Sequence, residues 1–134
     1  MGLRKIIRKA LYNLKYTKKK SNSVSGKNFL ITGASSGIGL SLTKSLVSKN
    51  KVIGIYNSNK SNLDNIRSNN LISVKCDFRN YSDFENLNKF ISEEKIDVII
   101  NCAGTFGSNN QSLENIDFDN LISVFKINSI SIIK

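Results

Sequence analysis

The stretch of sequence that decides the fold reads Thr32-Gly33-Ala34-Ser35-Ser36-Gly37-Ile38-Gly39. It joins an apolar run at residues 29–31 to a helical pattern that extends from Ile38 to about Lys49. A strand that turns directly into a helix leaves the first N–H groups of the helix unpaired, with the positive end of the helix dipole behind them. The stretch therefore predicts a phosphate site rather than an ordinary loop. Its glycines would allow the tight turn, the approach of a pyrophosphate and the close packing of helix on strand.

These residues resemble the cofactor motif of the short-chain dehydrogenase/reductase family. The pattern Thr-Gly-x-x-x-Gly-x-Gly at 32–39 has the spacing of the shorter, single-domain branch, and Ser36 stands where the extended branch usually has a glycine. The resemblance covers about residues 27–134, the first half of a complete member. It implies an α/β fold: a Rossmann-type, doubly wound parallel sheet, incomplete here, with four strands in the order 3-2-1-4.

The positive charge is confined to the N-terminal part of the chain. The 134 residues carry a formal net charge of +10, yet residues 1–27 hold nine Lys or Arg and no acidic residue. The rest of the chain is nearly neutral, which argues against a nucleic-acid-binding domain. We expect a basic extension and linker at 1–26 and a single NAD(P)-binding domain at 27–134.

The extension has the pattern of a basic amphipathic helix. Its apolar residues recur at helical spacing: Leu3, Ile6, Ile7, Ala10, Leu11 and Leu14. Through residues 3–20 such a helix could lie on an anionic membrane surface; it could also dock on its own domain, stay solvated, or act as a leader of the transit-peptide kind. No apolar stretch approaches the roughly 20 residues that span a bilayer.

The two cysteines, Cys76 and Cys102, fall at the ends of two expected strands. In a 3-2-1-4 sheet these strands lie three spacings apart, about 14 Å, which exceeds the roughly 7 Å Cα separation that a disulfide tolerates. We expect free thiols in a reducing compartment and hence a cytoplasmic protein, peripheral at a membrane if the extension binds lipid. With two cysteines and no histidine, no metal site is expected.

Strands and helices alternate from residue 28 to the C-terminus, which favours parallel pairing with right-handed crossovers. The expected strands are 28–32, 51–56, 71–75 and 96–101, and the expected helices are 38–49, 61–68, 82–94 and 117–134. In the first helix the expected inward positions are Ile38, Leu42, Leu46 and Val47. For the third helix, Ser82 is the expected N-cap, with Glu85 completing a capping box.

Ligands of such sheets bind beyond the carboxyl ends of the strands. After the second strand, Asn57 stands where an NAD-selective protein has a carboxylate for the ribose hydroxyl. Ser58 or Lys60 could then bind a 2′-phosphate, so we favour NADP over NAD as the cofactor. The hydroxyls of Ser35 and Ser36 could bond the phosphates.

The family resemblance assigns roles after the other strands. Asp77, followed by Phe78, matches the aspartate that accepts from the adenine amino group, and Asn101-Cys102-Ala103-Gly104 resembles the Asn-Asn-Ala-Gly motif. Asn128 matches a helical asparagine that supports catalysis. The expected cofactor contacts are Gly33, Ser35, Ser36, Gly37, Ile38, Gly39, Asn57, Ser58, Asp77, Phe78, Asn101, Ala103 and Gly104.

The family reaction passes a hydride between nicotinamide and a small-molecule carbonyl or alcohol substrate, with a tyrosine as general acid/base, a lysine four residues later and a serine. In a complete member these residues lie beyond the last helix of this chain. Two Tyr-x-x-x-Lys matches, Tyr16–Lys20 and Tyr56–Lys60, are rejected because one precedes the sheet and the other lies at the adenosine end.

We therefore expect the cofactor-binding half of an oxidoreductase, truncated, inactive alone and homo-oligomeric when complete. The alternative is a non-catalytic dinucleotide-binding or membrane-associated interaction protein. In the isolated chain residues 96–100 would form an apolar, unpaired sheet edge that promotes aggregation, whereas in the complete fold a further strand would flank it.

Overall fold

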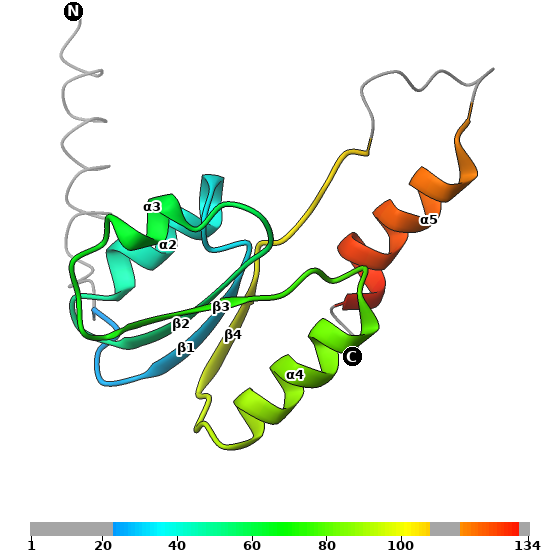
Figure 1. Ribbon diagram of the computed structural model, residues 1–134. Helices are drawn as coiled ribbons and strands as arrows, with labels where there is room; N and C mark the ends of the chain where they lie inside the picture. The colour runs from blue at the N-terminus through cyan, green and yellow to red at the C-terminus, as the bar shows by residue number, and fades with distance from the viewer. Residues whose placement is uncertain (1–22, 108–115, 132–134) are drawn as a thin grey trace, which may run out of the picture.

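Four parallel strands form the centre of the molecule in the order β3-β2-β1-β4 (Figure 1). The computed structural model describes residues 23–107 and 116–131. The strands are β1 (Asn28–Thr32), β2 (Lys51–Tyr56), β3 (Leu71–Lys75) and β4 (Val98–Asn101). The two central strands, β1 and β2, are buried on both faces, which is why their sequences are almost continuously apolar.

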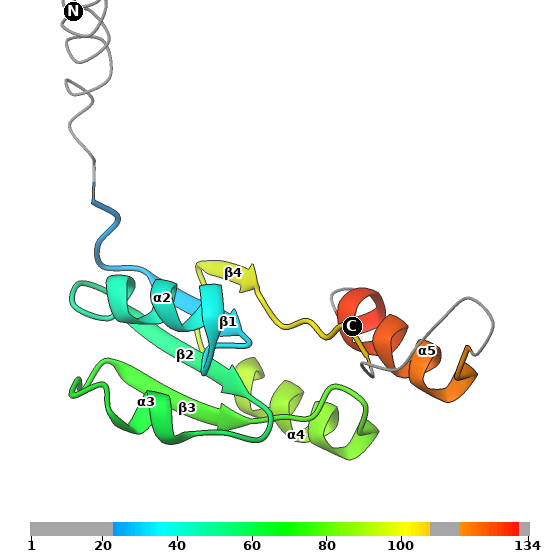
Figure 2. The same ribbon diagram turned by 90° about the horizontal axis from the view of Figure 1, so that it is seen from above.

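Helices cover both faces of the sheet. Figures 1 and 2 show α2 and α3 on one face and α4 on the other, while α5 and the π-helical segment η1 lie beyond the C-terminal end of β4. The helical segments are α2 (Gly37–Leu46), α3 (Ser61–Asp64), α4 (Tyr81–Ser92), α5 (Phe118–Phe125) and η1 (Lys126–Ile130). Among the described residues, no helix has both the length and the apolar character needed to span a bilayer.

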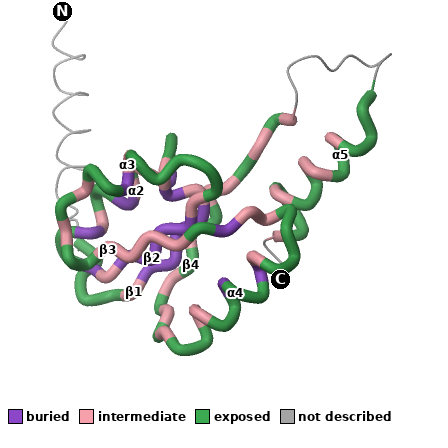
Figure 3. The backbone as a smooth tube through the Cα atoms, viewed as in Figure 1, coloured by how far each residue is buried: buried purple, intermediate pink, exposed green. Residues whose placement is uncertain are grey.

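The alternation of side chains along β1 divides the core into two clusters. Ile31 packs with Leu63 on the side of α2 and α3, whereas Leu30 packs with Leu87 on the side of α4. Figure 3 shows the resulting concentration of buried residues along the central strands. The carboxyl ends of all four strands are thereby held at one edge of a rigid layer.

The predicted sheet order is confirmed, and the strands β1, β2 and β3 have the expected bounds. The fourth strand begins at Val98 rather than Ile96, because Asp97 bonds the start of β1: its carboxylate accepts from the Asn28 N–H at 2.9 Å and its N–H donates to the Asn28 carbonyl at 2.9 Å. Strand β4 is an edge of the described sheet, and Ile99 on it is 59% exposed.

The expectation that Ile38 faces inward is wrong. Its side chain is 75% exposed, and Gly39 and Thr43 take the buried positions at the start of α2. The backbone of α2 approaches β1 too closely there for a larger side chain. Further along, Leu42 and Leu46 pack partly buried against the core, as expected.

Several helix boundaries also differ from the prediction: α2 ends at Leu46 rather than at about Lys49, α4 ends at Ser92 rather than at about Glu94, and the last helix continues from α5 into the π-helical η1. The N-cap of α4 is Asn80, whose side-chain oxygen accepts from the Ser82 N–H at 3.0 Å, so Ser82 lies inside the first turn. Asparagine is as favourable an N-cap as serine, and Asn80 precedes Ser82 in the chain. Helix α3 ends at Asp64 instead of Ser68, in a stretch rich in Asn and Ser, whose side chains favour turns. The predicted basic helix at 3–20 lies outside the described residues.

Candidate functional site

The glycine-rich turn after β1 depends on the absence of a side chain at Gly33. Its φ is +64°, and a Cβ there would lie 2.8 Å from the backbone nitrogen of Ala103 and 2.9 Å from the Cys102 carbonyl oxygen. Only glycine fits, because both the backbone conformation and the available space exclude a larger residue. The turn is thus packed directly against the chain that leaves β4.

The start of α2 is open rather than covered by protein. Ser36 is its N-cap and makes no side-chain capping bond, and Ser36, Gly37 and Ile38 are exposed. The bond from the Leu40 N–H to the Ser36 carbonyl, at 3.0 Å, closes the first turn and leaves the preceding amides without an intrahelical acceptor. A Cβ at Gly39 would lie 2.3 Å from the Gly33 carbonyl oxygen, so helix and strand pack as closely as the glycine spacing predicts.

Thr32 fixes the exit of β4 beside this turn. Its Oγ1 accepts from the backbone N–H groups of Cys102 and Ala103, both at 3.1 Å. The threonine is only 8% exposed. A single buried hydroxyl therefore joins the ends of β1 and β4.

The loop after β2 carries no charge at the expected selectivity position. Asn57 and Ser58 are exposed there. Lys60, expected as a partner for a 2′-phosphate, instead forms an i,i+4 ion pair with Asp64, with 3.2 Å between Nζ and Oδ1. The uncharged Asn57 and Ser58 are the residues of this loop that border the cavity described below.

The turn after β3 is organised around Asp77. Its carboxylate pairs with the Arg79 guanidinium, with 2.6 Å between Oδ2 and Nη2, and its own N–H donates to Asp83 Oδ2 at 2.9 Å. Hydrogen bonding to Arg79 holds the pKa of Asp77 below its usual range. The carboxylate is therefore ionised and acts as an acceptor at neutral pH.

Asn128 lies in η1, the π-helical segment that follows α5. Its side-chain amide meets the backbone of Thr105: Oδ1 accepts from the N–H at 2.9 Å, and Nδ2 donates to the carbonyl at 2.9 Å. π-helical turns inside helices often mark functional sites. Through the two bonds of Asn128, the π-helical segment η1 contacts the chain that continues from β4.

These segments border an open cavity of about 330 Å³ at the carboxyl edge of the sheet. Residues that follow every strand line it, together with one residue of η1. They are Gly33, Ser35, Ser36, Ile55, Tyr56, Asn57, Ser58, Cys76, Asp77, Phe78, Arg79, Cys102, Ala103, Gly104, Thr105 and Ile127.

Nine of the thirteen expected cofactor contacts thus border this cavity. The structure does not place the other four on its lining: Gly37, Ile38 and Gly39 lie in the first turn of α2, and Asn101 ends β4. Asn128 is not on the lining either and reaches it through Thr105. The structure therefore brings most of the expected residues together around one cavity.

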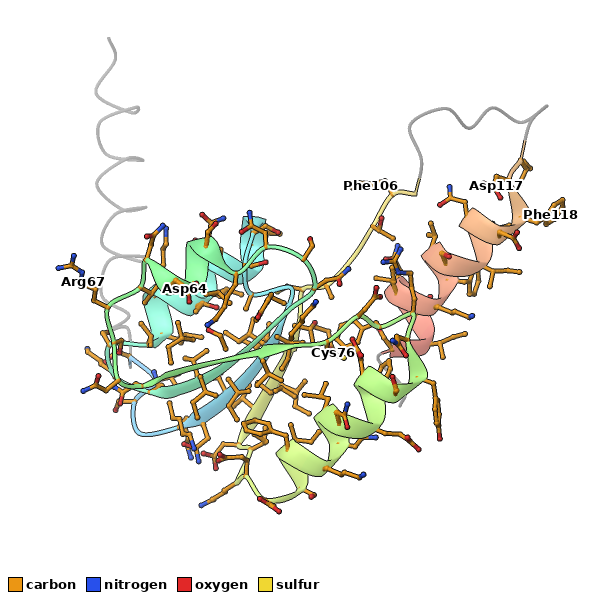
Figure 4. The ribbon with its side chains drawn as sticks, in the orientation of Figure 1. Asp64, Arg67, Cys76, Phe106, Asp117 and Phe118 are labelled. Carbon is orange, nitrogen blue, oxygen red and sulfur yellow. The ribbon has the colours of Figure 1, made fainter. Side chains whose placement is uncertain are left out.

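Both cysteines border the cavity from opposite edges of the sheet, and both are free thiols. Cys76, at the end of β3 in Figure 4, is 2% exposed, and burial together with the charges of Asp83 and Asp77 raises its pKa to about 11. Cys102 is half-buried.

The family model described as "short chain dehydrogenase" matches residues 27–134. The chain belongs to the short-chain dehydrogenase family. No curated protein sequence matches the chain significantly.

Solved short-chain dehydrogenases share this fold. A dehydrogenase/reductase from Sinorhizobium meliloti 1021 superposes with a TM-score of 0.68 at 21% identity, over 83% of this chain and 47% of that one. The short-chain dehydrogenase/reductase from Serratia marcescens gives 0.67 at 21% identity, with 83% and 48% coverage. A carbonyl reductase from Pseudomonas aeruginosa PAO1 gives 0.68 at 28% identity, with 78% and 49% coverage. The chain spans about half the length of these structures.

Sequence reasoning gave Thr32 no role beyond its place in the glycine-rich motif, and it missed Thr105 and Arg79. Thr32 and Thr105 act through contacts with residues 70 and 23 positions away, which no local pattern reveals. The sequence did carry a signal for Arg79. This residue lies two positions after Asp77, and at that spacing its side chain can hydrogen-bond an aspartate that forms a turn.

Proposed function

We propose that the chain is the cofactor-binding half of an NAD(P)-dependent oxidoreductase that transfers a hydride between nicotinamide and a carbonyl or alcohol substrate. The observation that carries this proposal is the cavity at the carboxyl edge, bordered by an uncovered glycine-rich turn and by residues after all four strands. A dinucleotide binds at this place in doubly wound sheets. When bound, the nicotinamide supplies the hydride chemistry.

The donor set fits such a cofactor. The hydroxyls of Ser35 and Ser36 and the open amides of α2 would hold the pyrophosphate. Gly33 and Gly104 would let the backbone approach the ribose that carries the nicotinamide. The ionised Asp77 would accept from the adenine amino group.

We propose NADP as the preferred cofactor. The loop after β2 presents Asn57 and Ser58 and no carboxylate to the cavity. A 2′-phosphate would meet no repulsion there and would gain hydrogen bonds from the side chains of Ser58 and Asn57. The ammonium group of Lys60, the other residue expected to bind a 2′-phosphate, pairs with Asp64.

Calorimetric titration of the chain with NADP and with NAD tests the preference. Asn57→Asp introduces a carboxylate beside the 2′-position and should weaken NADP binding about tenfold, with NAD binding kept or improved. Asn65→Asp, the same change at an exposed residue that caps the end of α3, should alter neither affinity. Stronger binding of NAD than of NADP by the unaltered chain would overturn the NADP assignment.

The hydride-transfer activity has its own test, because the alternative is a dinucleotide-binding protein without catalysis. The coding sequence past Lys134 should specify a strand ending in Ser and then a helix with Tyr-x-x-x-Lys. A stop codon directly after Lys134 would support the binding module instead.

A second proposal concerns residues 3–20, which lie outside the described residues and combine an apolar stripe with eight basic and no acidic side chains. We propose that they attach the protein to an anionic lipid surface. The described residues that follow enter the fold at the start of β1: Asn50 Oδ1 accepts from the Lys27 N–H at 3.1 Å, and its Nδ2 donates to the Val24 carbonyl at 3.0 Å. The described residues 24–27 thus lie at the amino-terminal ends of the strands, away from the cavity.

Vesicle co-sedimentation of the whole chain tests this attachment. The chain should pellet with vesicles that contain phosphatidylserine and stay in the supernatant with phosphatidylcholine alone. Leu11→Gln should reduce pelleting, whereas Asn13→Gln should not, because only Leu11 belongs to the apolar stripe. Equal pelleting with both vesicle types would end the proposal.

A further inference from the structure

The carboxylate of Asp77 has almost all of its acceptor positions occupied by a single residue. Oδ1 accepts from the backbone N–H and from Nε of Arg79, both at 2.9 Å. Oδ2 accepts from Nη2 at 2.6 Å, and Nε lies 3.2 Å from it. An ionised carboxylate offers about four acceptor positions. Because Nε has a single hydrogen, which it shares between Oδ1 and Oδ2, no described residue fills one remaining acceptor position on Oδ2.

The backbone around this ion pair is fixed from two sides. The Asp77 N–H donates to Asp83 Oδ2 at 2.9 Å, and the Asp77 carbonyl accepts from the Asn80 N–H at 2.9 Å. The only remaining freedom of the carboxylate is rotation of its own side chain. Arg79 removes that freedom, because a two-point contact between guanidinium and carboxylate fixes orientation as well as distance.

Arg79 also has a distinctive place in the cavity. Of the described residues that line it, Arg79 is the only basic one and Asp77 the only acidic one. The two charges neutralise each other, so this part of the cavity offers a directed hydrogen-bond acceptor rather than a net charge.

We propose that Arg79 is a positioning residue that selects the base of the dinucleotide. By holding Asp77, it presents the open position of Oδ2 to the cavity, where a base with an exocyclic amino group, such as adenine, can donate to it. This inference rests on the proposed function and deepens it, because it names the residue that sets which base the site accepts.

The selection follows from the chemistry of the acceptor. An ionised carboxylate has no hydrogen to donate, so it binds the amino group of adenine and repels the carbonyl oxygen that hypoxanthine carries at the same position. The depressed pKa of Asp77 keeps it in this state well below neutral pH. Without Arg79 the side chain can rotate away, and the site then distinguishes the two bases less well.

The test compares NADP with its deaminated analogue, nicotinamide hypoxanthine dinucleotide phosphate, by calorimetric titration of the chain. The unaltered protein should bind the adenine form about tenfold more tightly, the value of one good hydrogen bond to a charged group. In Arg79→Ala the preference should fall to about twofold, and Arg79→Lys should be intermediate because lysine keeps the charge but makes no two-point contact.

Arg67→Ala is the matched control, since it removes the same charge from an exposed arginine that lies before β3, at the opposite end from Cys76 (Figure 4). It should keep the tenfold preference. Circular dichroism melting of each variant identifies any that fails to fold. For such a variant Asp77→Asn replaces it, and this change should remove the preference that Arg79→Ala only reduces, because an amide can donate to the hypoxanthine oxygen.

Two results would overturn the inference while leaving the proposed function intact. One is an adenine preference in Arg79→Ala equal to that of the unaltered protein. The other is a loss of affinity in Arg79→Ala that affects NADP but not NAD, which would make Arg79 a phosphate ligand. An unaltered chain that binds none of these dinucleotides would instead overturn the proposed function, and this inference with it.

Discussion

The side-chain amide of Asn128 forms two hydrogen bonds with the backbone of Thr105, accepting from its N–H and donating to its carbonyl, each at 2.9 Å. The pair ties the π-helical segment η1 to the chain that leaves β4. Gly104 lies beside it, and a Cβ there would be 3.6 Å from Asn128 Oδ1. One asparagine thus holds the backbone at the border of the cavity.

Replacing Asn128 should loosen this border. Asn128→Ala removes both bonds and should lower the free energy of unfolding by about 1 kcal/mol, since both bonds are exposed to water and each contributes near the lower end of about 0.5–1.5 kcal/mol. Urea denaturation measures the change. Ser129→Ala, at the exposed neighbouring position, should change the stability by less than about 0.5 kcal/mol. An equal effect of both substitutions would mean that helix propensity, not the contact with Thr105, is responsible.

Gly33 should tolerate alanine far less well than Gly37. Both have positive φ, +64° and +50°, so both substitutions incur the penalty of the left-handed conformation, about 1 kcal/mol. Only at Gly33 would the new Cβ also clash with the backbone of Ala103, whereas at Gly37 nothing lies within 4 Å.

We expect Gly33→Ala to cost at least about 2 kcal/mol more than Gly37→Ala, because overpacking against backbone adds its own penalty. Thermal and urea unfolding of the two variants measure the difference. Equal losses would show that β4 moves away from the turn without cost.

The contribution of Thr32 to stability should depend on its hydroxyl group rather than on its shape. Thr32→Val keeps the volume but leaves the N–H groups of Cys102 and Ala103 without their acceptor, which should cost about 1–3 kcal/mol. Thr32→Ser keeps the hydroxyl and should lose less. If the Thr32→Val variant were as stable as the unaltered protein in urea denaturation, water would have to hydrogen-bond both N–H groups.

The strands could be predicted because they depend on local patterns, whereas the sheet order and most of the cavity lining could be predicted because the chain resembles a known family. The apolar runs gave three strands with their observed bounds, and the spacing of Gly33 and Gly39 gave the close packing of α2 on β1. What the sequence could not give were side-chain contacts between distant segments, such as Thr32 with Cys102. It also misplaced Ile38, since helical spacing alone cannot show that Gly39 takes the inward position.

The two thiols should react very differently with a maleimide. Cys76 is buried and its pKa is raised to about 11, so at pH 7.5 almost none of it is thiolate; Cys102 is half-buried. Mass spectrometry should find Cys102 modified at least about tenfold faster.

Because Cys102 borders the cavity, NADP should slow its modification, and Cys102→Ser should remove the fast phase. Faster labelling of Cys76 would mean that the turn after β3 opens readily.

The ion pair of Asp77 with Arg79 should make a contribution to stability that disappears in acid. Arg79 lowers the pKa of Asp77 in the folded protein, so between the folded and unfolded pKa values the unfolded chain binds more protons. The contribution is therefore fully present above the unfolded value, about 3.9, and is lost as pH falls through the folded value. The stability difference between the unaltered protein and Arg79→Ala should stay constant from pH 7 to pH 5 and shrink below about pH 4.

Urea denaturation across this pH range measures the stability difference, with Arg67→Ala expected to show no such change. A difference that persists undiminished at pH 3 would mean that Arg79 stabilises the turn by packing, not through the charge of Asp77.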